Sequence, residues 1–254
     1  MIILHNNKFV KKALVDALGP FSRGEGIFET LRIVNKKAVL IKMHLDRFFY
    51  SAKKINLKIK YNREEILKMF EKVIKKSPHK EQRVKIIATS SDTIVTSIKT
   101  KIDKKIYSGI SMKSTNLQRS MPEIKSMSRL TSFIAHENAV KEGFFDALLI
   151  DDNDEVYEGA YSNIFWFEKD TLCTRKNKVL PGITREIILK NTKFKTRFKT
   201  IKLQDLKKQK EIFLTQSITL IIPITKIDTT KIDNGKVGDN TKTIMKEINS
   251  LLSS

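Results

Sequence analysis

The sequence predicts a mixed α/β (α+β) protein made of two domains. Apolar residues recur at strand spacing in some segments and at helix spacing in others, and turn residues separate these segments. The length of 254 residues accommodates one large domain or two smaller ones, and the motifs described below favour two. Residues 115–128 lack periodicity and contain Pro122, which indicates a linker or an active-site crossing. We therefore expect a smaller N-terminal domain over residues 1–117 and a larger C-terminal domain over residues 118–254.

The first half of the chain predicts strands at residues 2–4, 26–34 and 38–41, two helices, and three further strands. The helices, at residues 43–55 and 63–74, carry apolar residues at helical spacing, and Asn62 is a favourable N-cap for the second. The later strands are expected at residues 84–88, 94–98 and 110–114. Residues 26–34 alternate only in part, so we expect that strand to be flanked on both faces.

The second half predicts three helices among short strands, many of them antiparallel. A helix over residues 130–142 is expected to end at Gly143, and another over residues 184–191 follows Pro181 and Gly182. A third helix, over residues 240–252, closes the chain. Strands are expected at residues 147–151, around residue 156, and at 162–167, 171–174, 211–215 and 221–224.

The chain is strongly basic, with a formal net charge of +21. Such a charge can indicate binding to nucleic acid or to anionic lipid. Lysine supplies 39 of the 49 basic residues, and the lysines are spread along the whole chain. No arginine-rich arm, basic patch interleaved with aromatic residues, or zinc finger accompanies them. We therefore expect a solvated basic surface and no nucleic-acid partner, while a preference for anionic substrates stays open.

The remaining composition narrows the class of protein further. The single cysteine, Cys173, excludes an intramolecular disulfide and fits a reducing compartment. The four histidines show no metal-ligand spacing, so we expect no metal. No stretch approaches the roughly 18 consecutive apolar residues of a membrane helix, and the apolar run at the N-terminus is too short for a signal peptide. We expect a cytoplasmic protein with no membrane partner.

Six short motifs occur in order along the chain, and together they carry a resemblance. They are similar to motifs of the fold type IV pyridoxal-phosphate enzymes, which include branched-chain aminotransferases, D-amino acid aminotransferases and aminodeoxychorismate lyases. The resemblance covers about residues 1–250. The motifs are Arg23-Gly24-Glu25-Gly26-Ile27-Phe28-Glu29-Thr30-Leu31-Arg32, His44-Leu45-Asp46-Arg47-Phe48 followed by Ser51-Ala52, Ile124-Lys125-Ser126-Met127-Ser128-Arg129-Leu130, Glu158-Gly159-Ala160-Tyr161-Ser162-Asn163-Ile164-Phe165, Leu180-Pro181-Gly182-Ile183-Thr184-Arg185, and Glu211-Ile212-Phe213-Leu214-Thr215 leading to Ile222-Pro223-Ile224.

The resemblance implies a two-domain fold like that of D-amino acid aminotransferase, with pyridoxal 5′-phosphate between the domains and a homodimer as the assembly. It identifies Lys125, in the third motif, as the lysine that holds the cofactor as a Schiff base. The amine must be neutral to attack the cofactor or to take a proton from the substrate, so we expect burial or a cationic neighbour to lower its pKa. The alternative is one solvated lysine among 39.

The resemblance also assigns residues to the two ends of the cofactor. Glu158 matches the carboxylate that keeps the pyridine nitrogen protonated. Arg47 matches a cationic clamp on the phosphate, and Ile183 and Thr184 would add backbone amides and a hydroxyl at a helix N-terminus. Ser217 would add a further hydroxyl. The alternatives are a turn glutamate, a surface arginine and a loop serine.

The resemblance favours a lyase, which acts on a small-molecule substrate, 4-amino-4-deoxychorismate, and releases pyruvate and 4-aminobenzoate for folate biosynthesis. Thr30 matches a threonine that the lyases use near the substrate, and Arg129 stands where transaminases commonly have tyrosine or leucine and some lyases have arginine. Two strings, residues 28–30 and 162–166, also look more like those of lyases. We therefore expect Lys125, Thr30 and Arg129 to be the catalytic residues.

Some residues depart from the pattern and keep alternatives open. Residues 88–93 lack both the arginine-containing string of D-amino acid aminotransferases and the arginine-glycine pair of lyases, and Ser128 stands where the family has asparagine. Residues 216–219 differ from the small residues of many members. A branched-chain or D-amino acid transaminase on the same fold is the first alternative, because a fold does not fix specificity. An inactive, basic, nucleic-acid-binding relative is the distant one.

Overall fold

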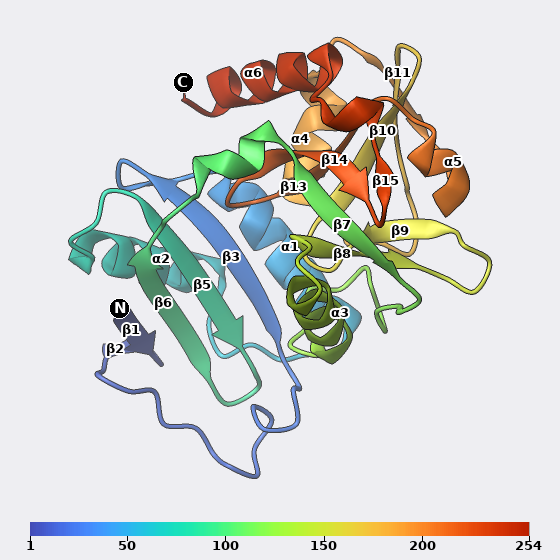
Figure 1. The fold of residues 1–254 in the computed structure, drawn as a ribbon. Helices are drawn as coiled ribbons and strands as arrows, with labels where there is room; N and C mark the ends of the chain where they lie inside the picture. The colour runs from blue at the N-terminus through green and yellow to red at the C-terminus, as the bar shows by residue number, and fades with distance from the viewer. Residues whose placement is uncertain (254) are drawn as a thin grey trace. The chain divides into compact units, whose positions relative to one another are not determined.

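The computed structural model describes the backbone of residues 1–253 and the side chains of residues 1–252, and it divides into two compact units. The first unit contains Met1–Lys101 together with Ile124–Ser128, and the second contains Ile102–Glu123 and the chain from Arg129 onward. Figure 1 labels most of the helices and strands of both units.

The first unit is built on an antiparallel sheet of six strands, in the order β2-β1-β6-β5-β3-β4. Its long central strands follow the apolar alternation of the sequence, and residues on one face of each are fully buried. The strands are β1 (Ile2–His5), β2 (Lys8–Phe9), β3 (Ile27–Val34), β4 (Lys37–Ala38), β5 (Gln82–Ala88) and β6 (Thr93–Lys99).

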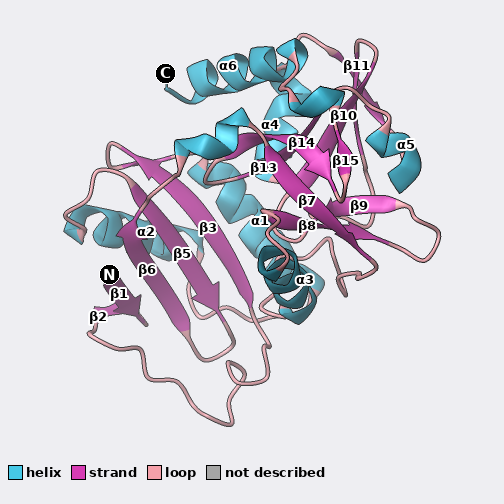
Figure 2. Cartoon of the chain, viewed as in Figure 1, coloured by secondary structure: helices cyan, strands magenta, loops and turns pink. Residues whose placement is uncertain are grey.

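Two helices, α1 (Ile41–Lys54) and α2 (Arg63–Lys76), cover one face of this sheet (Figure 2). Each helix is amphipathic and packs its apolar side, including Phe48 and Phe70, against the inward residues of the strands. Asn62 caps α2 as predicted: its side chain accepts a hydrogen bond from the Glu65 amide, and the Glu65 side chain accepts one from the Asn62 amide. The opposite face of β3 carries Phe28, which is buried, and the half-buried side chains of Thr30, Arg32 and Val34.

The second unit contains a sheet of nine strands that curls on itself. Its order is β12-β11-β10-β13-β14-β7-β8-β9, and β15 pairs with β14. β9 ends this order, yet it also contacts β10, because the Gly159 amide donates to the Ser162 carbonyl. The strands are β7 (Ile110–Thr115), β8 (Asp146–Ile150), β9 (Val156–Gly159), β10 (Asn163–Glu168), β11 (Thr171–Thr174), β12 (Lys195–Phe198), β13 (Ile212–Gln216), β14 (Leu220–Ile227) and β15 (Thr230–Lys231).

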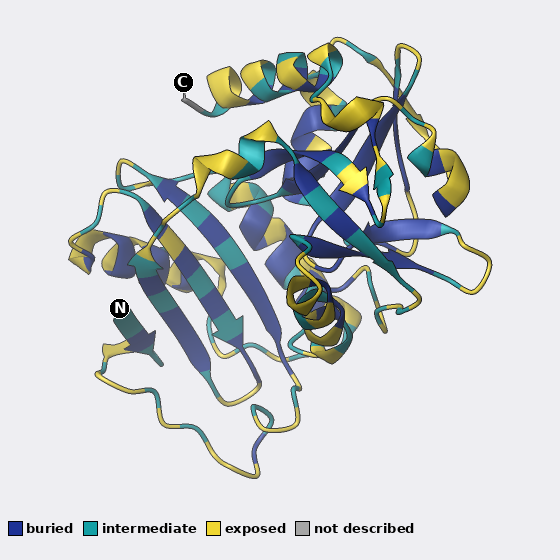
Figure 3. Cartoon of the chain, viewed as in Figure 1, coloured by how far each residue is buried: buried dark blue, intermediate teal, exposed yellow. Residues whose placement is uncertain are grey.

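The curled sheet encloses the main core of the second unit. Trp166, Ile222 and Met112 are among its fully buried members, and helix α5 (Leu203–Lys207) adds two leucines. A separate cluster lies between α3 (Leu130–Lys141) and β8. The other helices are α4 (Ile183–Asn191) and α6 (Asp239–Ser253), with short 3-10 helices η1 (Lys104–Ser108) and η2 (Asp233–Gly235). In Figure 3 the outer sides of α2 and α6 are exposed, as their amphipathic sequences require.

The division of the chain differs from the boundary expected at residues 117 and 118. Residues 102–117 belong to the second unit because β7 pairs in parallel with both β14 and β8. Residues 124–128 belong to the first unit because Ser126 forms a bridge with Ile27. Lys125 was therefore expected in the C-terminal domain, whereas the chain returns to the first unit to place it. The partners of these segments lie far away in sequence, so local periodicity carried no signal for this exchange.

Most predicted elements are present with ends shifted by one to three residues, and one prediction was wrong in part. The strand expected at residues 38–41 stops at Ala38, because Leu40 adopts a left-handed backbone (φ 54°) as the N-cap of α1, which begins at Ile41. Four short elements, β2, β12, β15 and α5, and the 3-10 helices η1 and η2 were not predicted. β2 and β15 are two-residue strands that form hairpins with the adjacent β1 and β14, and they are too short to show a period. β12 pairs with β11, which lies more than 20 residues earlier.

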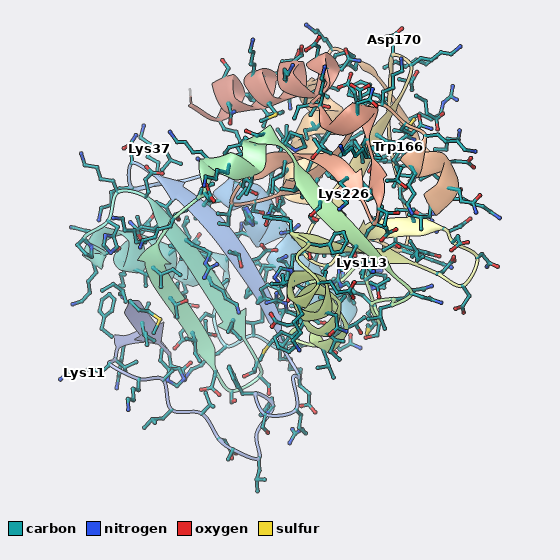
Figure 4. The ribbon with its side chains drawn as sticks, viewed as in Figure 1. Lys11, Lys37, Lys113, Trp166, Asp170 and Lys226 are labelled. Carbon is teal, nitrogen blue, oxygen red and sulfur yellow. The ribbon has the colours of Figure 1, made fainter. Side chains whose placement is uncertain are left out.

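The charged surface agrees with the scattered lysines of the sequence. Lys11 and Lys37, labelled in Figure 4, are exposed and project from the chain, whereas Trp166 is buried. Among residues 1–253, no helix is both long and apolar enough to cross a membrane.

Candidate active site

A buried ionic cluster joins the first two motifs within the first unit. Glu29 points from β3 toward α1, where its carboxylate accepts two hydrogen bonds from Arg47, at 2.7 Å to Nε and 2.9 Å to Nη2. It also accepts one from His44 Nδ1 at 2.7 Å. All three side chains are nearly inaccessible to solvent. The predicted clamp, Arg47, is thus held in place by Glu29, a residue to which the motifs alone gave no role.

The charges in this cluster follow from burial and pairing. Burial would raise the pKa of Glu29, but the Arg47 guanidinium and the His44 ring hold it well below its ordinary value. Burial lowers the pKa of His44, and the hydrogen bond to Glu29 only partly opposes this. The cluster is therefore an ionised Glu29–Arg47 pair with a neutral His44 that donates to it.

The backbone of the third motif runs beside β3. The Phe28 amide donates to the Lys125 carbonyl at 3.0 Å, and the Met127 amide donates to the Gly26 carbonyl at 2.8 Å. A Cβ on Gly26 would lie 2.6 Å from both the Ala88 carbonyl and the Met127 sulfur, so this approach requires glycine. The Lys125 ammonium lies 4.8 Å from the centre of the Phe28 ring. The first and third motifs therefore meet, with Lys125 partly buried.

Thr30 lies on the face of β3 opposite to Glu29, on the same side as Phe28. Its register partner on β5 is Lys85, whose ammonium also lies near the Phe28 ring, at 5.1 Å from the centre. Lys85 was not among the predicted site residues. The sequence predicted only that Lys85 lies in a strand; the register that places it opposite Thr30 comes from the structure.

Residues 88–93, which depart from the family patterns, form the turn between β5 and β6. Thr89 Oγ1 accepts hydrogen bonds from the amides of Asp92 and Ser91, and Asp92 bonds to the ring of His5 at 2.6 Å. The turn is thereby tied to β1. In place of arginine it offers a compact arrangement of hydroxyls and one paired carboxylate.

In the second unit, Glu158 lies buried at the end of β9, and three hydrogen bonds orient its carboxylate. Oε1 accepts from Arg119 at 2.7 Å, and Oε2 accepts from the Leu180 amide at 3.0 Å and from Asn163 Nδ2 at 3.2 Å. The fourth motif therefore contacts the fifth. Arg119 and Asn163 are partners that the sequence had not assigned.

The N-terminus of α4 places Ile183 and Thr184 next to this network. Gly182 is the N-cap, and no side chain caps the helix. A Cβ on Gly182 would lie 1.8 Å from Asn163 Oδ1, so the helix start packs directly against the residue that also holds Glu158. Ile183 and Thr184 are both buried. The structure thus brings together three predicted residues, Glu158, Ile183 and Thr184.

The predicted hydroxyl of Ser217 lies in the turn between β13 and β14, half-buried. Beside it in the sequence, Thr215 and Thr219 have buried hydroxyls without a hydrogen-bond partner among the described residues, and so does Ser162. Buried polar groups normally have partners, so these hydroxyls suit a polar ligand. The sequence had given no role to the hydroxyls of Thr215 and Thr219, and residues 216–219 were noted there as a departure from the family.

Arg129 packs on the ring of Tyr161 at 4.8 Å, at the start of α3. The same ring lies 5.1 Å from that of His136, which bonds to Asp146 at 2.9 Å. Burial lowers the pKa of Arg129, with Tyr161 opposing, and the Asp146 hydrogen bond raises the pKa of His136. Within its unit, Arg129 is therefore placed by an aromatic residue of the fourth motif.

A comparison with known protein families gives a match to the part of the chain in which the motifs occur. The model of the family described as amino-transferase class IV matches residues 26–227. The chain belongs to the aminotransferase class IV family. It is accordingly an enzyme, and enzymes of this family use pyridoxal 5′-phosphate.

Relatives with different reactions resemble the chain. A D-alanine aminotransferase of Listeria monocytogenes is 26% identical over 265 residues, which cover 94% of this chain and 91% of the relative. The branched-chain amino acid aminotransferase of Escherichia coli has a TM-score of 0.91 at 21% identity, covering 99% of this chain and 94% of that one. A protein of Legionella pneumophila provisionally named 4-amino-4-deoxychorismate lyase has a TM-score of 0.86 at 20% identity, covering 94% and 96%. The two solved structures, from Escherichia coli and Legionella pneumophila, confirm the predicted fold.

The residues present fit pyridoxal phosphate. A helix start without a side-chain cap suits a phosphate group, and the unpartnered hydroxyls of Thr215 and Thr219 can donate to its oxygens. Glu158 is a buried carboxylate fixed by three donors, which suits a pyridine N–H. Lys125 can supply the amine.

Proposed function

We propose that this enzyme is a pyridoxal-phosphate-dependent 4-amino-4-deoxychorismate lyase that releases pyruvate and 4-aminobenzoate for folate biosynthesis. The observation that carries the proposal is the position of Thr30, whose side chain lies on the same face of β3 as Phe28, the ring beside Lys125. A threonine at this position is the feature that the sequence shares with lyases. Arg129, packed on Tyr161, is the second such feature.

When bound, the cofactor supplies an electron sink for the electrons released as the C–H bond beside the substrate's amino group breaks. Lys125 would hold the cofactor covalently and then take that proton at its Nζ. Thr30 would donate a hydrogen bond to the substrate from the same strand face. Arg129 would pair with a substrate carboxylate, since a guanidinium matches a carboxylate in two parallel hydrogen bonds.

Further residues would position the cofactor. Glu158 would accept the pyridine N–H, and the amides of Ile183 and Thr184 at the start of α4 would donate to the phosphate. The Ser217 hydroxyl would add another donor. Arg47 would contribute charge to the phosphate while its partner on β3 fixes the guanidinium.

The test is to identify the products of the cofactor-loaded protein. With aminodeoxychorismate we expect 4-aminobenzoate and pyruvate in equal amounts, and Lys125→Ala should abolish both and remove the absorption band of the bound cofactor. Lys37→Ala, an exposed lysine of the first unit, serves as the control and should leave both unchanged. A loaded wild type that forms no 4-aminobenzoate would refute the lyase.

A transaminase is the second candidate, because the D-alanine aminotransferase of Listeria monocytogenes is a relative along nearly its whole length. D-Alanine or a branched-chain amino acid would then be offered with 2-oxoglutarate. Formation of glutamate, with no 4-aminobenzoate from aminodeoxychorismate, would select this reaction.

We also propose that the enzyme is a cytoplasmic homodimer, as the family resemblance and the single buried Cys173 suggest. Light scattering of the purified protein should give twice the chain mass of 29.3 kDa. A monomeric mass would contradict the homodimer, and fractionation of the source cells tests the compartment.

A further inference from the structure

Two lysine ammonium groups lie beside one aromatic ring in the first unit. Lys125 Nζ is 4.8 Å from the centre of the Phe28 ring, and Lys85 Nζ is 5.1 Å from the same centre. Since both distances end at one point, the two nitrogens are no more than about 10 Å apart. Two like charges at this separation interact appreciably where water is partly excluded.

The backbone fixes this arrangement. Phe28 lies on β3, Lys85 lies on the neighbouring β5 opposite Thr30, and Lys125 lies on the segment that pairs with β3 at Ile27. Lys85 therefore reaches the Phe28 ring from β5, and Lys125 reaches it from the segment whose backbone is hydrogen-bonded to β3. Backbone hydrogen bonds hold both lysines in register with β3.

Other charged or titratable groups of the first unit also lie near Lys125. On β3, Glu29 is paired with Arg47 of α1, so these two charges offset each other. His44, also on α1, lies close enough to sense the charge of Lys125, and burial favours its neutral form. Arg32 shares the face of β3 that carries Phe28 but lies four residues along the strand, whereas Lys85 places a like charge beside the same ring as Lys125.

We propose that Lys85 is a positioning residue that acts through Lys125: its positive charge disfavours the protonated form of the Lys125 amine and keeps that amine available as a nucleophile and base. The inference rests on the proposed role of Lys125, and it deepens that role by naming the cationic neighbour. The same mechanism, a lysine made reactive by an adjacent cation, is a general route to an activated amine.

A charge series at position 85 tests the proposal. The full chain, freed of cofactor, is labelled with acetic anhydride between pH 6 and 11, and mass spectrometry of the peptides follows Lys125. We expect the midpoint for Lys125 to be unchanged in Lys85→Arg and to rise by about 0.3 to 1.2 pH units in Lys85→Met. In Lys85→Glu the rise should be about twice as large, because the neighbouring charge is reversed.

Salt and a matched variant separate charge from structure. In about 1 M salt the Debye length falls to about 3 Å, so the rise should shrink to less than half. Lys76→Met is the control, because Lys76 Nζ lies 4.5 Å from the ring of Phe9 in the same unit, and its loss should not move Lys125. Thermal unfolding checks that each variant is folded.

The outcomes that overturn the proposal are specific. No rise in Lys85→Met, equal rises in Lys85→Met and Lys85→Glu, or a rise that about 1 M salt leaves intact would each do so. If Lys85→Met fails to fold, the comparison of Lys85→Arg with Lys85→Glu still decides. The labelling uses no cofactor, so its result does not depend on the lyase assay. A protein that forms no 4-aminobenzoate would refute the proposed function and leave the labelling result unchanged.

Discussion

At the residue scale, the orientation of each predicted site residue depends on the partners that form hydrogen bonds with it. Arg47 was predicted from its motif, yet Glu29 is what orients its guanidinium, through two hydrogen bonds in a site closed to water. Glu158 likewise owes its orientation to Arg119, Asn163 and a backbone amide. A motif shows which groups are available, whereas the contacts show how each is held.

Replacing Glu29 by glutamine should leave Arg47 as a buried charge without this counter-charge. Removing one partner of a buried ion pair typically costs about 3 to 5 kcal/mol, so we expect a comparable loss in the free energy of unfolding. Urea denaturation of the two proteins measures it. The exposed pair of Arg63 and Asp46 provides the control, since Asp46→Asn should cost less than about 1 kcal/mol. Equal losses in the two variants would contradict the buried-pair account.

His44 should make the protein sensitive to acid in a defined range. Burial lowers its pKa in the folded state below the ordinary value of 6.5, so the unfolded chain binds a proton first. The stabilisation is complete above pH 6.5 and declines as the pH falls below it. Glu29 adds a second decline below its ordinary value of 4.5, because its folded pKa is also lowered. Thermal unfolding between pH 8 and 5 should therefore show a fall that His44→Gln reduces; an unchanged fall would place the sensitivity elsewhere.

At the element scale, the proposed site depends on a helix end and an irregular connection more than on the bodies of helices. The start of α4 is closed onto Asn163 without room for a Cβ at Gly182, and this packing links the phosphate end of the proposed site to Glu158. The crossing segment at residues 124–128 is another example, because a few residues without periodicity place Lys125 beside β3. In both cases an irregular connection, held by a regular element, positions the chemistry.

Gly182→Ala should weaken cofactor binding more than it weakens the fold. The new Cβ would displace Asn163 and with it a donor to Glu158, so we expect the Kd for pyridoxal phosphate to rise at least about tenfold, beside about 1 to 3 kcal/mol lost to overpacking. Gly143→Ala is the control: Gly143 has a positive φ of 83° with open space around it, so alanine there should cost stability alone. Fluorescence titration with the cofactor compares the two. Similar affinities would show that the Gly182 packing is not part of the site.

At the scale of the whole molecule, the predicted site residues Lys125, Thr30 and Arg47 belong to the first unit, and Glu158, Thr184 and Arg129 belong to the second. The net charge of +21 is distributed over both as exposed lysines. A ligand that binds the folded protein alone stabilises the whole chain by mass action. Cofactor binding should therefore register in global unfolding.

Pyridoxal phosphate at 100 times its Kd should stabilise the folded chain by about 2.7 kcal/mol, which corresponds to a rise of about 5 to 11 °C in Tm for a protein of this size. Lys125→Ala should lose most of this rise, and pyridoxal, which lacks the phosphate, should give a smaller one. Differential scanning calorimetry measures all three. A wild type whose Tm does not respond to the cofactor would contradict the proposed set of residues.

The sequence by itself determined the class of fold and the family, and it supplied the residues of the proposed site, because periodicity and short motifs are local properties. Local sequence properties of this kind include the N-cap of α2, the glycine that ends α3, and the order of the six motifs. Only the tertiary structure decided that Glu29 holds Arg47, that residues 124–128 join the first unit, and that Lys85 lies near Lys125. These pairs are 18 to 99 residues apart, and packing alone brings such residues together.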